Sequence, residues 1–382
     1  MFREKNKGIT LVALVITIVI LLILAGISIS TLTNTGIFQK AKDAKKASEN
    51  AEKEQRETLG EYEKELNKYT AQELTENKIN TVLSKTENTV LKDKNGNVFT
   101  LPAGFKVVVN DDTGNVKTVD KGIVIEDATV DNNGNATPTS GSQFVWVPVG
   151  DIKKDDGTIV KIKLNRYMFD SDGKETSQKE NIVETDFSEN AGKGNTTAKN
   201  ISNFKSSVTT NMGYYIGRYE ARTTTARNDK GNALTQITEK GTDQVYNYVT
   251  QQQAAQQAQG MYTSNNFVSD LMNSYAWDTA TLFLQNCGTN KKYSGQTSLN
   301  SSLLQTGTNA LSETNKIDKQ CNVYDMASNI FEWTTETFND SSTPCVRRGD
   351  SYLLSGTYTG YRSYGSTSSS YVNVGFRLLL YL

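Results

Sequence analysis

Histidine does not occur anywhere in the 382 residues of this chain. Its absence excludes Ser-His-Asp and Cys-His catalysis, and it excludes every zinc site that needs an imidazole ligand. Neither sign of charge prevails, because 41 basic and 42 acidic residues leave a net charge of −1. The chain therefore lacks an overall field that would attract nucleic acid, and we expect no nucleic-acid partner.

Proline and cysteine are also scarce. Four prolines, together with many Asn, Thr, Ser and Gly residues, indicate an extracellular, turn-rich surface. Cysteine occurs only as Cys287, Cys321 and Cys345. This odd number allows either one disulfide plus one buried thiol, or three inert buried thiols. The length is sufficient for two or three domains.

A charge-free apolar run occupies residues 9–29, close to the N-terminus. At a rise of about 1.5 Å per residue, a helix of this length spans roughly 31 Å, which is close to the hydrocarbon thickness of a bilayer. Arg3, Lys5 and Lys7 precede the run. Their positive charge predicts a cytoplasmic N-terminus, a membrane helix at 9–30 and an extracellular remainder.

The basic stretch ends in Lys7-Gly8, and the apolar run starts at once with Ile9. This arrangement resembles a type IV prepilin signal. The resemblance implies a leader at 1–8 and a prepilin peptidase as partner, cutting between Gly8 and Ile9 and leaving the apolar helix on the mature protein. Most pilins carry glutamate at the fifth mature position, where this chain has Ala13, and this departure argues against a major pilus subunit. A plain single-span anchor is the alternative.

Two further regions separate the anchor from the rest of the chain. Residues 40–69 are rich in strong helix formers, contain no proline and have too few apolar residues for a core-facing stripe. They predict a solvated stalk helix over 31–70. Short β-type runs divided by turn signals such as Asn95-Gly96 then predict a β-rich connecting region over 71–139.

Six short segments in the remainder of the chain form an ordered series. They are FVWVPV at 144–149, GYYIGRYEA at 213–221, YAWDTA at 275–280, NVYDMASNIFEWT at 322–334, RRGDSY at 347–352 and GFR at 375–377. The series resembles the formylglycine-generating-enzyme (sulfatase-modifying factor) family, whose fold is a variant of the C-type lectin fold. The resemblance implies an α+β protein in which a mixed, strand-rich, lectin-like head at 140–382 follows the membrane and stalk helices.

The resemblance also sets expectations for individual residues. Some family members bind calcium near the NxxEW motif, which implies Asn329 and Glu332 as oxygen ligands. Trp333 is expected in the core beside a carboxylate satisfied by backbone N–H groups, and Arg377 is expected to pair with a carboxylate. Asp278 is expected in the first turn of a helix, where it would complement the helix dipole. A Gln/Ala tract at 251–259 is expected to be a helical or irregular surface insertion rather than a site.

This chain lacks the two cysteines that the catalytic members of the family use. In those members two cysteines follow the RGGSY element, whereas residues 352–364 contain none. A formylglycine-generating oxidase would need a reactive thiol pair with copper, and neither Cys321 nor Cys345 has the required spacing. We therefore predict a head without enzymatic activity, with the oxidase as the alternative.

Residues 351–371 are dominated by Tyr, Ser, Gly and Thr. Tyrosine offers a large contact area at low entropic cost and Ser and Gly offer adaptable hydrogen bonding, so this is the composition of binding loops. A Tyr/Ser-rich β surface without a partner is the alternative. The predicted ligand face consists of Asp350, Tyr352, Leu354, Tyr358, Tyr361, Arg362, Tyr364, Ser366 and Tyr371.

The same segment resembles the variable region of retroelement-diversified proteins, which share the lectin-like fold and vary just before a constant GFR-type ending. Together these patterns predict a bacterial, membrane-anchored, pilin-like surface protein whose head binds an extracellular glycan or protein. A minor pilin with a structural role among pilus subunits is a further alternative.

Overall fold

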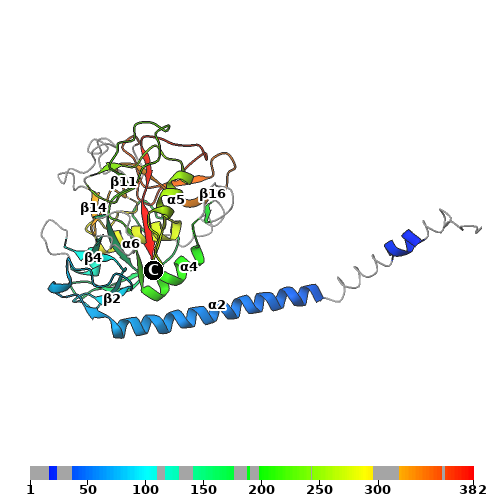
Figure 1. Ribbon diagram of the computed structural model, residues 1–382, viewed down its shortest axis with the longest axis horizontal. Coiled ribbons are helices and arrows are strands. Elements are labelled where there is room, and N and C mark those ends of the chain that lie inside the picture. Colours follow the sequence, from blue (N-terminus) through cyan, green and yellow to red (C-terminus); the bar gives the residue numbers. More distant parts are fainter. Residues whose placement is uncertain are drawn as a thin grey trace, which may run out of the picture. The chain divides into compact units, whose positions relative to one another are not determined.

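The computed structural model describes residues 17–23, 37–109, 117–128, 141–175, 187–189, 198–241, 243–295, 318–354 and 358–382. The chain divides into two compact units, Met1–Leu59 and Gly60–Leu382. Helix α2 (Ile37–Thr70) contributes residues to both. Figure 1 shows the course of the chain and the labels of its elements.

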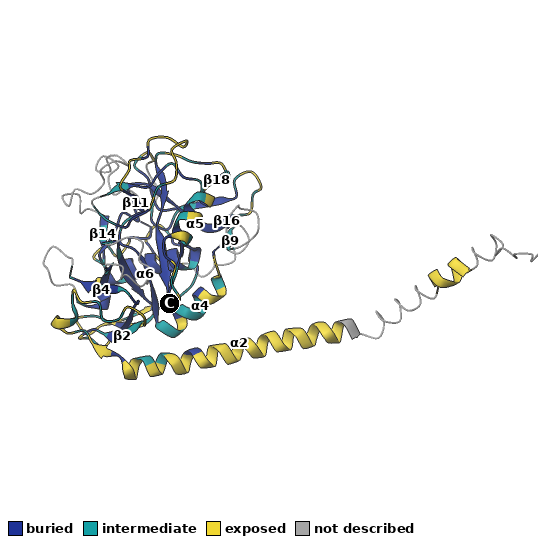
Figure 2. Ribbon diagram, viewed as in Figure 1, coloured by how far each residue is buried: buried dark blue, intermediate teal, exposed yellow. Residues whose placement is uncertain are grey.

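The predicted stalk helix is present as α2 from residue 37 onward. Its residues 39–59 are all exposed, as the yellow ribbon in Figure 2 shows. Exposed ion pairs such as Lys45–Glu49 accompany this polar surface. In the second unit Gly60 is buried, and the Asn67 amide donates to the Thr210 carbonyl at 3.4 Å. The end of α2 is thereby attached to the C-terminal end of the next long helix, α4.

The other elements of the second unit are short. The helices are η1 (Glu76–Lys78), η2 (Val119–Lys121), α4 (Ile201–Asn211), α5 (Gln251–Gly260) and α6 (Ser274–Cys287). The first strands are β1 (Gln72–Glu73), β2 (Thr89–Lys92), β3 (Val98–Leu101), β4 (Phe105–Val108), β5 (Val124–Asp127), β6 (Gln143–Pro148), β7 (Gly150–Lys153), β8 (Ile159–Ile162), β9 (Phe187–Glu189) and β10 (Gly213–Gly217). The later strands are β11 (Arg222–Thr223), β12 (Gln244–Val245), β13 (Val268–Leu271), β14 (Lys319–Gln320), β15 (Val323–Tyr324), β16 (Phe331–Phe338), β17 (Cys345–Arg348), β18 (Arg362–Gly365), β19 (Val374–Phe376) and β20 (Leu378–Tyr381).

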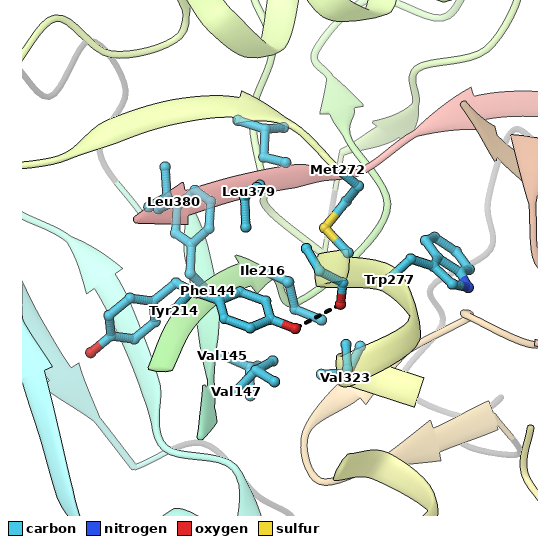
Figure 3. Close-up of a cluster of buried hydrophobic side chains, with 14 of the residues drawn as sticks. Phe144, Val145, Val147, Tyr214, Ile216, Met272, Trp277, Val323, Leu379 and Leu380 are labelled. Carbon is cyan, nitrogen blue, oxygen red and sulfur yellow. Dashed lines mark hydrogen bonds between the residues drawn. The ribbon is translucent and has the colours of Figure 1, made fainter. Parts of the chain in front are cut away.

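A six-stranded antiparallel sheet organises the core, in the order β13-β20-β10-β6-β5-β4. Apart from Gln143 at the start of β6, all residues of the central strands β6, β10 and β20 are buried, so both faces of the sheet are covered. Figure 3 shows the labelled side chains of β6, β10 and β20 gathered with those of Met272, Trp277 and Val323. The buried Tyr214 hydroxyl donates to the Ala276 carbonyl at 2.6 Å, which fixes α6 to this core.

A second sheet joins strands from distant parts of the sequence in the order β18-β17-β16-β19, with β9 also paired to β16. β16 pairs with β19 in parallel and with β17 and β9 antiparallel. α5 contacts both β16 and β13 of the six-stranded sheet. The C-terminal strands β19 and β20 follow each other directly and connect the two sheets.

The predicted connecting region and the predicted head belong to one compact unit. Strands β4 and β5 lie before residue 139, yet β5 pairs with β6, so both are part of the central sheet. The α+β class of the head agrees with the prediction.

The predicted anchor lies largely beyond what the structure describes. Residues 17–23 are helical, whereas the leader at 1–8, the cleavage position Gly8–Ile9 and the rest of the 9–30 span lie outside the described residues. No helix in the described part of the chain combines the length and the apolar character needed to cross a membrane.

Candidate functional site

The predicted ligand segment follows β17 and contains β18, and these two strands are adjacent and antiparallel. β17 and β18 pair with Val346 opposite Tyr364, Arg347 opposite Ser363 and Arg348 opposite Arg362. β18 lies at the edge of its sheet. Residues 355–357 of the segment lie outside the described residues. Because successive side chains of a strand point to opposite faces, this register divides the predicted residues between the two faces of the β17–β18 pair.

A buried arginine–carboxylate network, formed by Arg166, Asp278, Glu336, Arg348 and Arg362, lies on one face of this pair. Arg362 Nε donates to the two Glu336 carboxylate oxygens at 2.9 and 3.1 Å. Arg348 Nη1 and Arg166 Nη2 reach the same carboxylate at 3.2 and 2.7 Å. Both Arg348 and Arg362 also donate to Asp278.

The positive charges of the three arginines keep the Glu336 carboxylate of this network ionised. Burial alone would raise the pKa of Glu336, but the guanidinium groups of Arg362, Arg348 and Arg166 outweigh burial and lower the pKa to about 2. Glu336 is therefore ionised at neutral pH. β18 is held to β16 by ionic hydrogen bonds and to α6 through Asp278, which makes the edge strand a fixed platform.

Three expectations change as a result. Arg362 is buried within the network, so we remove it from the predicted ligand face. Asp350 is also buried, and its Oδ1 accepts the Ser351 amide proton at 2.6 Å, so its carboxylate does not contribute to an exposed face. Asp278 lies beyond the first turn of α6, which is capped by Asn273, and its carboxylate serves Arg348 rather than the helix dipole.

An aromatic stack covers the same face of the strands. The rings of Tyr364 and Phe338 are nearly parallel, with centroids 4.2 Å apart and an interplanar angle of 12°. Phe187 of β9 lies 5.1 Å from Phe338. Tyr364 is 46% exposed, so one of the predicted ligand residues is accessible here. Phe187 and Phe338 were not predicted, and nothing in their local sequence distinguishes them from core residues.

The opposite face carries a different group, which we call the tyrosine–arginine face: Arg347, Tyr358, Tyr361, Ser363 and Tyr371. The Arg347 guanidinium lies over the Phe331 ring at 4.7 Å, with the Tyr371 ring at 5.9 Å. Arg347 Nε donates to the Ser363 hydroxyl at 3.1 Å. The Tyr358 and Tyr361 rings pack edge to face at 5.6 Å. Tyr371 is 49% exposed, whereas Tyr358 and Tyr361 are half-buried.

Arg347 and Ser363 are the residues of this face that the sequence reasoning missed. The doublet Arg347-Arg348 contains the signal, because adjacent residues of a strand cannot both enter the same network. Burial lowers the pKa of Arg347, and the neighbouring Tyr371 and Tyr361 phenols counteract this change. Among the described residues, Arg347 forms no ion pair with a carboxylate.

A further tyrosine borders Tyr371. The Tyr248 amide donates to the Tyr371 carbonyl at 3.1 Å, and the Asn247 side chain donates to the Val372 carbonyl at 2.8 Å. Tyr248 has φ of +52°, a left-handed conformation that is uncommon for a bulky residue. Burial raises the pKa of Tyr352, and the nearby Tyr248 phenol raises it further through an electrostatic interaction. Tyr248 and Tyr352, both half-buried, therefore lie close together.

The other two predicted positions are at turns. Leu354 is 45% exposed, and its amide donates to the Ser351 carbonyl at 3.0 Å. Ser366 is half-buried, and its hydroxyl contacts those of Ser368 and Ser369 at 3.1 and 3.2 Å. These contacts stabilise the turn after β18.

The predicted calcium ligands have other partners. Arg377 donates to both carboxylate oxygens of Glu332, at 2.7 Å from Nη2 and at 3.0 and 3.2 Å from Nε. The Asn329 amide donates to the Glu220 carboxylate. The described residues contain no group of three or more His, Cys, Asp or Glu side chains that could hold a metal ion. Calcium binding by Asn329 and Glu332 stays a prediction.

The three cysteines are free thiols. Burial raises the pKa of Cys287 to about 12 and raises that of Cys321 as well. Cys345 is buried in β17. At neutral pH Cys287 and Cys321 are thus protonated, whereas nucleophilic attack and metal binding require the thiolate.

Comparisons with known proteins give little beyond this geometry. No protein-family model matches the chain, and no curated protein matches it. Among solved structures, Treponema denticola variable protein 1 is similar at 14% sequence identity, with 65% of this chain and 98% of that chain covered and a TM-score of 0.34. A score of this size does not establish a shared fold, so the family resemblance read from the motifs stays a prediction.

Proposed function

We propose that this chain is a bacterial surface protein whose head binds an extracellular glycan or protein through the tyrosine–arginine face. One observation carries the proposal. Arg347, which has no carboxylate partner among the described residues, is surrounded by accessible or half-buried tyrosines on a strand pair fixed from behind by buried ion pairs. A rigid backbone that presents aromatic rings loses little entropy when a ligand binds.

The head acts without covalent chemistry in this proposal. The catalytic cysteine pair of the formylglycine-generating-enzyme family, which the chain resembles, is absent at 352–364. The raised pKa values of Cys287 and Cys321 further support a non-catalytic head, because neither thiol is poised as a nucleophile.

The N-terminal sequence supports surface display. The Lys7-Gly8-Ile9 junction and the apolar run after it favour processing by a prepilin peptidase, retention in the membrane and an extracellular head. Replacing Gly8 by a bulky residue such as valine should block cleavage, and the uncut chain would be heavier by the mass of residues 1–8. Mass spectrometry of the membrane fraction would measure this difference. A wild-type chain that retains residues 1–8 in the membrane fraction would exclude the processing step.

The binding test uses the full chain in detergent on arrays of glycans and surface proteins. Tyr371→Ala should abolish the capture of any ligand that the wild type binds, because this ring is the most exposed part of the face. Tyr371 is a better choice than Tyr361, whose ring packs against the core. Tyr62→Ala is the matched control, since Tyr62 is an exposed tyrosine on α2. Equal binding by wild type and Tyr371→Ala would show that the assigned face is wrong.

A further inference from the structure

The environment of Arg347 indicates which chemical class of ligand the tyrosine–arginine face can bind. A guanidinium presents a planar fork of N–H donors. In Arg347 the described residues use only Nε, which donates to Ser363. The two terminal amino groups have no hydrogen-bond partner among those residues, and the neighbouring rings of Phe331 and Tyr371 offer π-faces but no carboxylate.

The adjacent Arg348 shows, by comparison, how a guanidinium in the same strand is neutralised. The terminal amino groups of Arg348 reach Glu336 and Asp278, and its Nε donates to the Tyr361 carbonyl at 3.1 Å. Arg348 is buried and Arg347 is half-buried, but only Arg348 receives compensating negative charge. A half-buried guanidinium without such compensation is unfavourable for folding. Residues kept at a cost to stability are characteristic of binding sites.

We propose that Arg347 binds the carboxylate of an acidic saccharide, an inference that rests on the proposed function of the tyrosine–arginine face. The free fork matches the two oxygens of a carboxylate. The Tyr371 ring beside it is 49% exposed and offers a flat surface on which a pyranose ring can stack. The Ser363 hydroxyl at the rim is suited to sugar hydroxyls.

An acidic peptide also carries carboxylates, but the arrangement favours the sugar. Among the five described residues that define the face, Arg347 is the one cation and the others are tyrosines and a serine, so we expect the site to accept one negative charge. A peptide rich in Asp and Glu would place further carboxylates against the phenol groups of Tyr361 and Tyr371, where nothing among the described residues compensates them.

The test measures calorimetric binding of the full chain in detergent to three probes. These are a panel of carboxylated oligosaccharides containing uronic or sialic acids, the same oligosaccharides as neutral methyl esters, and oligoglutamate. We expect at least one acidic saccharide to bind, and its methyl ester to bind about tenfold to a hundredfold more weakly, as for loss of a charge-assisted hydrogen bond. Equal affinity for acids and esters would overturn the inference, as would binding of oligoglutamate alone or of no acidic saccharide.

Two variants locate the effect. Arg347→Met should reduce the affinity for the acid to that for the ester, and Arg347→Lys should give an intermediate value because lysine keeps the charge but loses the fork. The melting temperature of Arg347→Met should equal or exceed that of the wild type, since a half-buried charge without a carboxylate partner is removed. A lower melting temperature would assign Arg347 a structural role and contradict the inference.

The inference and the proposed function can fail separately. If a neutral ligand binds, Tyr371→Ala abolishes its binding and Arg347→Met leaves it unchanged, then the face is correct and the acidic ligand is wrong. If Tyr371→Ala leaves all binding unchanged, then the face itself is wrong.

Discussion

Arg347 and Arg348 are neighbours in the chain, yet their guanidinium groups lie on opposite faces of the same strand. Arg348 donates to Glu336 at 3.2 Å and to Asp278 in the buried network, whereas Arg347 donates to the Ser363 hydroxyl at 3.1 Å and lies over Phe331. The alternation of strand side chains thus gives one arginine a structural role and leaves the other available to a ligand.

The buried network should be essential for stability. Glu336→Gln removes the carboxylate that Arg166, Arg348 and Arg362 share, and it leaves their positive charges with Asp278 as the main compensation. Breaking a buried ion pair in this way costs about 3–5 kcal/mol. Urea unfolding of the full chain at neutral pH would measure the change in the free energy of unfolding.

An exposed ion pair serves as the control for this measurement. Asp172 and Lys292 lie 2.8 Å apart with both side chains more than 60% exposed. Asp172→Ala should cost about 0–1 kcal/mol, because water and salt screen an exposed pair. Similar losses for Glu336→Gln and Asp172→Ala would contradict the assigned importance of the network.

Local sequence patterns predicted the strands and the core well. The FVWVPV run belongs to the predicted strand-rich head, and β6 is buried from Phe144 to Pro148. Trp333 is fully buried as predicted. Arg377 was expected to pair with a carboxylate, and its partner is Glu332. The same pair corrects the expectation that backbone N–H groups satisfy Glu332. An arginine 45 residues away does so, and a motif cannot show a partner at that separation.

Long-range contacts account for the other errors. Arg362 was assigned to the ligand face because it stands among tyrosines and serines, but its partners Glu336 and Asp278 are 26 and 84 residues away. The Gln/Ala tract at 251–259 was expected as a helical or irregular surface insertion; it is helical, as α5, but its Gln251, Ala254, Ala255 and Ala258 are buried. There the Gln251 amide donates to the Thr334 carbonyl at 2.6 Å. Polar composition alone does not reveal such a buried partner.

Stability should depend on pH through Glu189. Burial first, and then the charge of Glu336 on the neighbouring strand, raise the pKa of Glu189 from 4.5 to about 7, although the Ser274 amide and the Thr335 hydroxyl oppose the shift. Between these two values the folded state binds more protons than the unfolded state, so this contribution to stability is lost as the pH rises from 4.5 through 7. Glu336, with its pKa lowered to about 2, acts in the opposite sense, and its contribution is lost as the pH falls below 4.5.

The variant Glu189→Gln isolates this effect. Glutamine resembles the protonated acid, so it should raise the free energy of unfolding at pH 8 and change it little at pH 5. Denaturant unfolding at the two pH values measures the difference. A variant that is less stable than the wild type at pH 8 would show that ionised Glu189 stabilises the fold.

Gly122 should tolerate no side chain. It has φ of +83°, and a Cβ atom placed there would lie 1.9 Å from the Cys321 carbonyl oxygen. Gly157 has the same φ with nothing within 4 Å of such an atom, which makes it a matched control. Gly157→Ala should cost about 1–2 kcal/mol for the left-handed backbone, and Gly122→Ala should cost about 1–3 kcal/mol more from the clash. Equal losses in urea unfolding would mean that η2 does not pack this closely against Cys321.

The hypothesis of retroelement diversification makes a positional prediction. Substitutions that arise at adenines of the template should accumulate at exposed positions such as Tyr364, Tyr371 and Leu354, because nearly half of each of these residues is accessible to solvent. They should be depleted at Arg362, which holds the network, and at Gly360, where a Cβ atom would lie 2.8 Å from both Phe169 and the Ser294 carbonyl. Deep sequencing of codons 349–382 in a growing population, together with the DNA just downstream, measures this distribution. Substitutions at the exposed positions with a near-copy template would identify the varied face, whereas a uniform segment without a template would indicate a binding protein of fixed specificity.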